Sequence, residues 1–186
     1  MTRTIPEVHP ELQVVIDEFE SALIRLHALR DSVAGDKWAD RPAPDRWSIA
    51  ECIAHLNLTS TAFLPLLRTG LDEARRSGRA APARYRRDLI GWLLWKSMGP
   101  PVTRKFRTTA PFVPRSDRTS ADHLAEFERL QAEQLALARA ADGLPIHRVQ
   151  IASPFNTRLH YNVFSALSIL PRHQHRHLWQ AEQVLK

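Results

Sequence analysis

Three histidines alternate with polar residues in PRHQHRHLWQ, residues 171–180. On a helix, which turns about 100° per residue, His173 and His177 share one face and His175 lies on the opposite one. Two imidazoles one turn apart are a common way to present two nitrogens to one metal ion, yet such pairs also occur as hydrogen-bonded residues. The spacing predicts that His173 and His177 point inward and that His175 faces solvent, and it leaves both interpretations of the pair open.

A third candidate is His55, at the edge of the apolar side of the helix predicted around AECIAHLN. On periodicity alone, the favoured interpretation is a core histidine bonded to a carbonyl or a carboxylate. Cys52 is the only cysteine, which excludes an internal disulfide and a zinc site built from several thiolates. We interpret it as a small core residue. The remaining histidines receive no role: His9, His27, His123, His147 and His160.

Helices must position these side chains. Apolar residues spaced three and four apart predict a first helix that starts near Pro10 and ends before residue 34. Ser48 and Glu51 form the S-x-x-E pattern of a capping box, which starts a second helix. Gly70 or Gly78 ends that helix.

A third helix is predicted from near Thr119 to the segment DGLP, and a fourth from about His160 to the end, interrupted or kinked at Pro171. The segment IHRVQIASPFNTR between them is expected to be partly extended. The proline-rich stretch 99–116 is expected to be a long crossover. These elements predict an all-α four-helix bundle over residues 1–186, a single domain with a long crossover between the second and third helices.

The basic, tryptophan-rich segment 83–98 is expected to hold a short helix that packs on the bundle with its arginines in water. A homodimer contact is the second interpretation. A cover over the open end of the site and contact with an anionic membrane are further alternatives.

The overall charge is +6, spread along the chain, which favours a role in solubility over nucleic-acid binding. The longest apolar run, 89–95, is too short to span a bilayer. The N-terminus has no apolar segment typical of a signal peptide. We therefore expect a cytoplasmic protein that binds neither nucleic acid nor membrane.

Three segments in this order and spacing resemble the DinB-like (DinB/YfiT) superfamily of small metal-binding bundles. They are RPAPDRWSIAECIAHL, the crossover KFRTTAPFVP, and the ending LPRHQHRHLWQAEQV with its H-x-x-x-H-x-x-Q pattern. The resemblance implies a divalent metal site formed by His55, His173 and His177. It also implies the long crossover.

Three neutral imidazoles suit zinc, nickel, cobalt or iron, and zinc or nickel is expected here. Three protein ligands leave coordination positions open, as in catalytic sites. The resemblance implies either transfer of a low-molecular-weight thiol or hydrolysis of an unidentified small molecule. Glu51 and Gln180, each one turn from a ligand, are candidates for orienting the imidazoles. Gln180 as an amide bonded within the bundle is an equal alternative.

Many members carry an acidic residue soon after the second-helix histidine, whereas this chain has LNLTSTAF. Asn57 or Thr59 could hydrogen-bond a metal-bound water, but neither is a strong general base, so no catalytic residue is assigned. Three hypotheses result. The chain is a metal-dependent enzyme, a non-catalytic metal or small-ligand binding module in a stress response, or an interaction protein that no longer binds metal.

Overall fold

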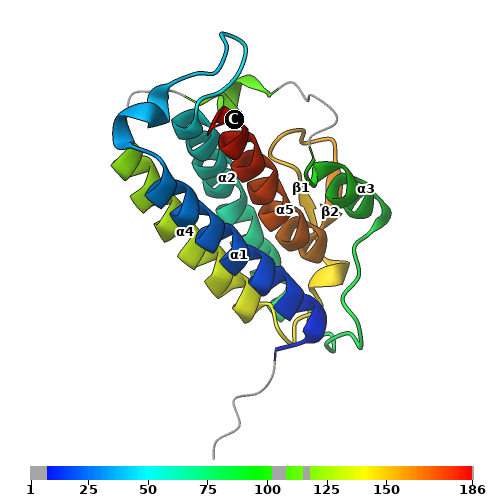
Figure 1. The fold of residues 1–186 in the computed structure, drawn as a ribbon. Helices are drawn as coiled ribbons and strands as arrows, with labels where there is room; N and C mark the ends of the chain where they lie inside the picture. Colours follow the sequence, from blue (N-terminus) through cyan, green and yellow to red (C-terminus); the bar gives the residue numbers. More distant parts are fainter. Residues whose placement is uncertain (1–7, 102–107, 115–117, 186) are drawn as a thin grey trace, which may run out of the picture.

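The computed structural model describes residues 8–101, 108–114 and 118–185. Four long helices form a bundle in which each helix packs against two others (Figure 1). Helices α1 and α2 each contact α4 and α5. The prediction of an all-α four-helix bundle is confirmed. The bundle helices are α1 (Pro10–Ser32), α2 (Ile49–Arg76), α4 (Ser120–Ala140) and α5 (Val163–Glu182).

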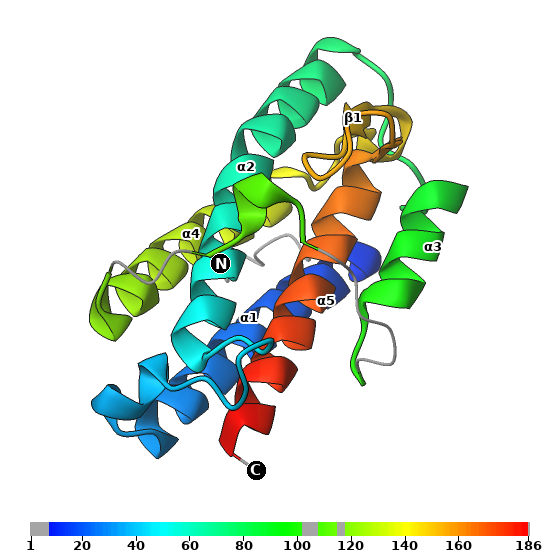
Figure 2. The same ribbon diagram turned by 90° about the horizontal axis from the view of Figure 1, so that it is seen from above.

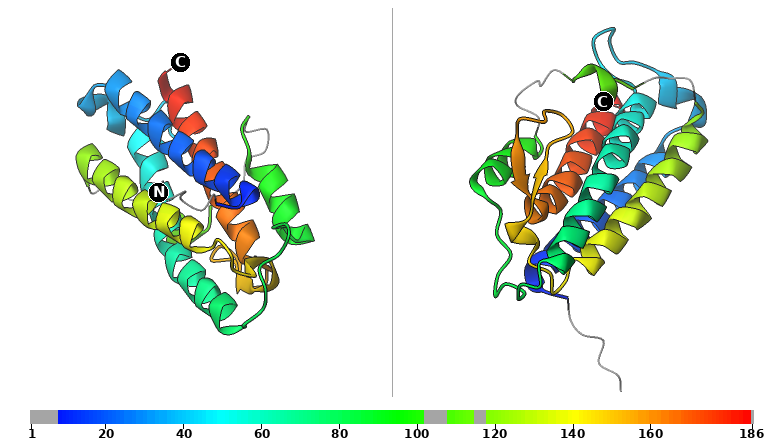
Figure 3. Two further views of the ribbon diagram at one scale, coloured as in Figure 1. Left: turned by 90° about the horizontal axis from the view of Figure 1, so that it is seen from below. Right: turned by 180° about the vertical axis from the view of Figure 1, so that it is seen from behind.

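The crossover from α2 to α4 contains the short helix α3 (Leu89–Met98), which packs on α5 outside the bundle (Figure 2). A two-stranded antiparallel hairpin, β1 (Gln150–Ala152) and β2 (His160–Asn162), contacts α2 through β1 and α3 through β2. Seen from behind, α3 and the hairpin lie on the same side of the bundle (Figure 3). Short 3₁₀ turns complete the described elements: Gly35–Ala39, Ala110–Phe112, Ile146–Arg148 and Gln183–Leu185.

The helix starts follow from local side-chain chemistry. Ser48 accepts a hydrogen bond from the backbone N–H of Glu51, whose carboxylate accepts one from the N–H of Ser48. Thr119 and Asp122 form the same reciprocal box at the start of α4. Each box satisfies amides that have no partner within the helix. Both predicted starts, at 48 and 119, are thereby confirmed.

The fourth bundle helix differs from its prediction in two ways. It begins at Val163 rather than near His160, because His160–Asn162 pair with β1 and the Asn162 side chain caps the helix by accepting from the N–H of Ser165 at 2.8 Å. It also runs without interruption through Pro171, which lies inside the helix. The loss of one helical hydrogen bond there is offset by packing, since α5 contacts α1, α2 and α3.

Most of the core is apolar, but three glutamines form a buried amide cluster between α4 and α5. The side chains of Gln131 and Gln174 donate to each other's oxygens, at 3.1 and 2.7 Å. Gln174 also donates to Gln134 at 2.9 Å, and Gln131 donates to the carbonyl of Phe19 on α1 at 2.6 Å. None of the three glutamines is more than 2% exposed. Reciprocal bonding of this kind offsets the cost of burying amides.

Helix α3 is held tightly against α5. A Cβ on Gly91 would lie 2.2 Å from the Cβ of Ser165, so only glycine allows this approach. The Asp88 carboxylate caps α3 and also accepts from the N–H of Asn162 at 2.6 Å, which joins the crossover to β2. Segment 83–98 therefore packs on the bundle, as expected, and Arg84 and Arg86 are exposed. Arg87 is not in water as expected, because it is partly buried with its guanidinium 4.3 Å from the ring centre of Trp95. No helix among the described residues is long and apolar enough to cross a membrane.

Candidate metal centre

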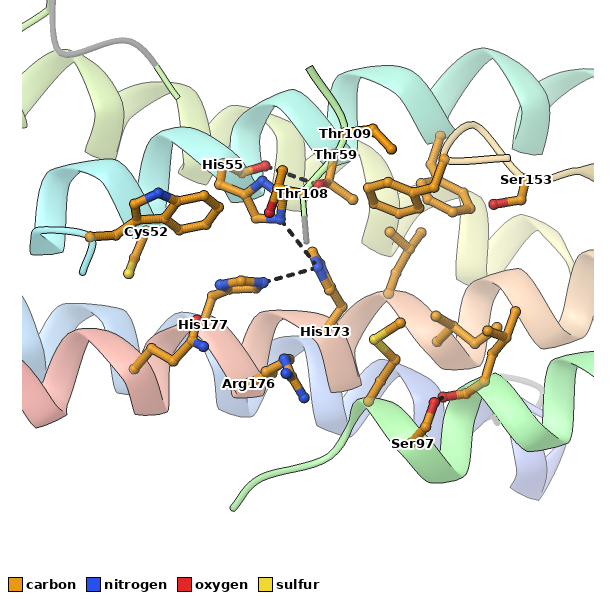
Figure 4. A pocket seen from close by; sticks show the side chains of 18 of the residues that line it. Cys52, His55, Thr59, Ser97, Thr108, Thr109, Ser153, His173, Arg176 and His177 are labelled. Carbon is orange, nitrogen blue, oxygen red and sulfur yellow. Dashed lines mark hydrogen bonds between the residues drawn. The ribbon is translucent and has the colours of Figure 1, made fainter. Parts of the chain in front are cut away.

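Three histidines from two helices meet at one point inside the bundle. His55 comes from α2, and His173 and His177 come from successive turns of α5. The Nε2 of His173 lies 3.3 Å from the Nε2 of His55 and 3.1 Å from the Nε2 of His177 (Figure 4). Each residue is at most 7% exposed. Sequence reasoning thus identified a group that the fold brings together across more than a hundred residues.

The partner of Nδ1 sets the tautomer of His55. This nitrogen lies 2.8 Å from the carbonyl oxygen of Phe112, which can only accept, so Nδ1 carries the proton. The lone pair of Nε2 is then directed at the two α5 imidazoles. Phe112 belongs to the crossover, which therefore orients one candidate ligand.

The three rings are held in the neutral form that a metal requires. Burial lowers the pKa of His55, and the hydrogen bond to Phe112 offsets this only in part. Burial lowers the pKa of His173 and of His177 well below the usual range, and the neighbouring imidazole and Arg176 charges lower both further. Ligand imidazoles do not have to lose a proton before binding when they are already neutral.

The convergence fits a cation better than it fits a self-contained hydrogen-bond cluster. Three Nε2 atoms meet, and the Nε2 of His55 has no proton to donate. The ligand nitrogens of the three histidines lie within 4.8 Å of one another, so this group can hold a metal ion. Three neutral imidazoles suit several first-row divalent metals.

Aromatic rings pack against the three imidazoles. Trp47, just before α2, lies with its ring centre 4.9 Å from that of His55 and 5.8 Å from that of His177. Phe155, in the loop of the hairpin, lies 5.9 Å from His173. Each of the three imidazoles therefore packs against at least one aromatic ring outside the group.

The two residues predicted to orient the ligands have different roles. Glu51 is engaged at the start of α2, where its carboxylate pairs with Arg41 and caps the helix. The hydrogen bond that orients the His55 ring runs from its Nδ1 to the carbonyl of Phe112, not to Glu51. Gln180 lines the same cavity as His177 and favours the charged form of that imidazole. No hydrogen bond of ordinary length joins His177 Nδ1 to a described group.

The engagement of Glu51 predicts an acid-dependent loss of stability. Burial raises the pKa of Glu51, but the hydrogen bonds from Arg41 and Ser48 outweigh it and the pKa is lowered overall. A lowered folded-state pKa means that the ionised carboxylate stabilises the fold above its unfolded pKa, about 4.3, and that this stabilisation is lost as the pH falls through the lower folded value.

We therefore expect Glu51→Gln to lower the free energy of unfolding by about 1–2 kcal/mol at pH 7. The difference from the wild type should shrink in acid below the unfolded pKa. Urea denaturation at pH 7 and at an acid pH below the unfolded pKa measures this difference in the free energy of unfolding. Glu73→Gln, which replaces an exposed carboxylate on the same helix, is the control. An equal difference at both pH values would contradict this assignment.

His175 lies on the opposite face of α5 from the pair, but it is partly buried rather than fully exposed to solvent. Its Nε2 lies 3.1 Å from the carbonyl of Glu18, because α1 covers that side of α5.

Cys52 is buried and its pKa is raised to about 12 by burial, so its thiol stays protonated. Asn57 donates to the carbonyl of His123 on α4 at 2.9 Å, away from the role considered for it.

The three histidines line a cavity of about 880 Å³. This volume is in the range of about 300–1,000 Å³ typical of small-molecule sites. Beyond the three histidines, the cavity wall is formed largely by apolar side chains from α2, α3, α5 and the hairpin, including Phe63, Leu94, Met98, Phe155 and Ile169. Helix α3 thus covers one side of the cavity, an alternative considered for segment 83–98.

Sequence reasoning missed the residues that support the centre. Phe112 acts through a backbone carbonyl, which leaves no signal in side-chain patterns. Nothing in the sequence distinguishes Trp47 and Phe155 from other aromatic residues in loops. Arg176, between the two α5 histidines, also lines the cavity and was assigned no role.

Comparison with known proteins gives one result. A family model described as the DinB superfamily matches residues 18–181, nearly the whole bundle. No curated protein and no solved structure matches the chain significantly.

Proposed function

Since the chain belongs to the DinB superfamily, we propose that it binds a divalent metal ion through His55, His173 and His177 and acts as a metal-dependent enzyme on a small molecule. The observation that carries the proposal is the convergence of three neutral, buried Nε2 atoms on the wall of a large cavity. Such a metal, with coordination positions open, would lower the pKa of a bound thiol or water.

Transfer of a low-molecular-weight thiol is the favoured reaction, and hydrolysis is the second candidate. Among the described residues that line the cavity, Asp45 is the one carboxylate. It lies in the loop before α2 rather than next to the candidate ligands in the sequence. Hydrolysis commonly uses a protein general base to take a proton from water, whereas a thiol is acidic enough to ionise readily. The scarcity of carboxylates therefore supports thiol chemistry.

Turnover assays on tag-free protein loaded with zinc or nickel test the reaction class. One arm combines cysteine, glutathione, bacillithiol or mycothiol with an activated aryl halide or an epoxide, and thiol consumption is followed. The other arm follows hydrolysis of nitrophenyl esters. We expect metal-dependent thiol consumption that is lost in His177→Ala and kept in His175→Ala. Metal binding without turnover in either arm would instead support a non-catalytic binding module.

A further inference from the structure

Helix α3 lies outside the bundle, with one side against α5 and β2 and the other side away from the bundle (Figure 2). Its inner residues include Leu94 and Met98, which line the cavity. Nine large apolar side chains are exposed among the described residues, and this one ten-residue helix holds four of them. They are Leu89, Ile90, Trp92 and Leu93, which are 71%, 39%, 42% and 52% exposed. Such clustering on a surface marks a contact with another apolar body.

The exposed side chains form one face of the helix. Leu89 and Leu93 are one turn apart, and Lys96 follows on the same line. Trp92 lies beside them, and the Lys96 ammonium is 5.1 Å from its ring centre. A lysine at the edge of such a face can lay its aliphatic stem along an apolar surface and keep its charge in water. The outer face of α3 is therefore apolar along its length and cationic near its C-terminal end.

The formal charge of the chain is concentrated in this helix and just before it. Basic residues occur throughout the sequence, but elsewhere acidic residues balance them. Residues 75–98 contain seven arginines and lysines and one acidic residue, Asp88, so their formal charge of +6 equals that of the whole chain. The Asp88 carboxylate caps α3 and accepts from the N–H of Asn162. The segment that carries the apolar face is therefore strongly basic.

Two of these cations stand close to the two ends of α3. Arg86 precedes the helix and Lys96 lies in its last turn, and both are exposed. Three of the others have contacts within the chain: Arg75 pairs with Asp72, Arg84 pairs with Glu11, and Arg87 packs over Trp95. Arg86 and Lys96 thus border the apolar face with positive charge, which is complementary to an anionic surface.

A second copy of the chain matches this face less well than an anionic surface does. In a symmetric dimer the same face of each copy packs against itself. Lys96 would then lie near Lys96 or Arg86 of the other copy, where like charges repel. The one carboxylate of the segment, on Asp88, is already engaged at the start of α3. An anionic surface replaces this repulsion with attraction.

We propose that α3 rests on an anionic lipid surface. Leu89, Trp92 and Leu93 enter the boundary between headgroups and acyl chains, and Arg86 and Lys96 lie beside lipid phosphates. An apolar face with an interfacial tryptophan and flanking cations is typical of helices that lie in the plane of a membrane surface. The contact is peripheral, because ten residues are too few to span a bilayer. It replaces the expectation of no membrane contact with an alternative considered for segment 83–98.

The chain offers a matched control for the apolar face. Val14 and Ile24 on α1 are 54% and 70% exposed, close to the values for Leu93 and Leu89. The pair Leu89→Ser and Leu93→Ser removes apolar surface from α3, and the pair Val14→Ser and Ile24→Ser removes a similar amount from α1. All four side chains are exposed, so neither double variant disturbs the core.

Vesicle flotation tests the proposal with tag-free protein. One set of vesicles is phosphatidylcholine alone, and the other contains equal parts of phosphatidylcholine and phosphatidylglycerol. We expect the wild type to partition onto the anionic vesicles at least tenfold more strongly, and this preference should fall as salt rises from about 0.05 to about 0.5 M. The α3 serine pair should lower partitioning about tenfold or more, whereas the α1 pair should leave it within about twofold.

The charges are tested separately. Arg86→Gln combined with Lys96→Gln should lower partitioning onto the anionic vesicles about tenfold or more and leave binding to phosphatidylcholine unchanged.

Failure of the wild type to float with anionic vesicles would overturn the proposal, and this comparison needs no variant to fold. Equal losses in the α3 and α1 serine pairs, or equal binding to both kinds of vesicle, would also overturn it. Sedimentation velocity without lipid covers the remaining occupant. A wild-type dimer that the α3 serine pair converts to monomer would assign this face to a second copy of the chain instead of lipid.

Discussion

Replacing His177 with alanine is expected to reduce bound zinc or nickel from near-stoichiometric to background. Removing only an outer partner of a metal ligand costs about 10- to 100-fold in affinity, and loss of a ligand should exceed that. His55→Ala and His173→Ala should behave alike, because the three Nε2 atoms form one group. Elemental analysis of tag-free protein and competition with a chromophoric chelator measure the loss.

His175→Ala is the matched control for these variants. It removes an imidazole from the same helix, but from the face that contacts α1. Metal content should stay at the wild-type level, although the melting temperature can fall with the lost contact. A chelator should lower the melting temperature of the wild type and of His175→Ala, since an ion that binds only the folded state stabilises it. Metal retained in His55→Ala, or lost equally in His175→Ala, would refute the assigned centre.

The second large effect is expected in the buried amide cluster of Gln131, Gln134 and Gln174. Gln174→Leu removes an amide that bonds to both other glutamines. Each buried glutamine amide that loses its hydrogen-bond partner lowers the free energy of unfolding by about 1–3 kcal/mol. For a chain of this size, each kcal/mol lowers the melting temperature by about 2–4 °C. Urea denaturation and thermal melting monitored by circular dichroism measure the change.

A triple variant separates unsatisfied hydrogen bonds from simple mispacking. Replacing Gln131, Gln134 and Gln174 together with leucine removes the stranded amides, and leucine is close to glutamine in size. Apolar replacement of all partners in a buried polar group is often nearly neutral. The triple variant should therefore be more stable than Gln174→Leu. If it is less stable, packing rather than hydrogen bonding accounts for the effect.

The bundle could be predicted from the sequence because its main signals are local. Helical periodicity and the capping pairs Ser48–Glu51 and Thr119–Asp122 depend on residues within one or two turns, and the structure has both boxes. The start of α5 was less predictable. His160–Asn162 become a strand only because β1 lies beside them, and that pairing is a tertiary contact that no local pattern records.

In the candidate site, too, local spacing predicted some features, whereas others depend on tertiary contacts. Spacing separated His173 and His177 from His175, while the link to His55 came from a family resemblance rather than from periodicity. Which element covers each face of α5 could not be predicted. The sequence therefore placed His175 in solvent, whereas contact with α1 partly buries it. Glu51 was also predicted to orient an imidazole, whereas the carbonyl of Phe112 holds the Nδ1 of His55.

The amide cluster has a consequence for the alignment of the three histidines. Gln174 directly follows His173 in the chain, and it meets its partners in α4 at only one register of the two helices. A slip of one turn, about 5.4 Å, would put Leu170 or Leu178 in the place of Gln174 and leave the α4 amides stranded. Asn57 joins α2, which carries His55, to α4 in a similar way. Buried amide contacts between α5 and α4 and between α2 and α4 therefore fix the registers of these helices. The same registers align the three imidazoles, with no metal ion needed to select them.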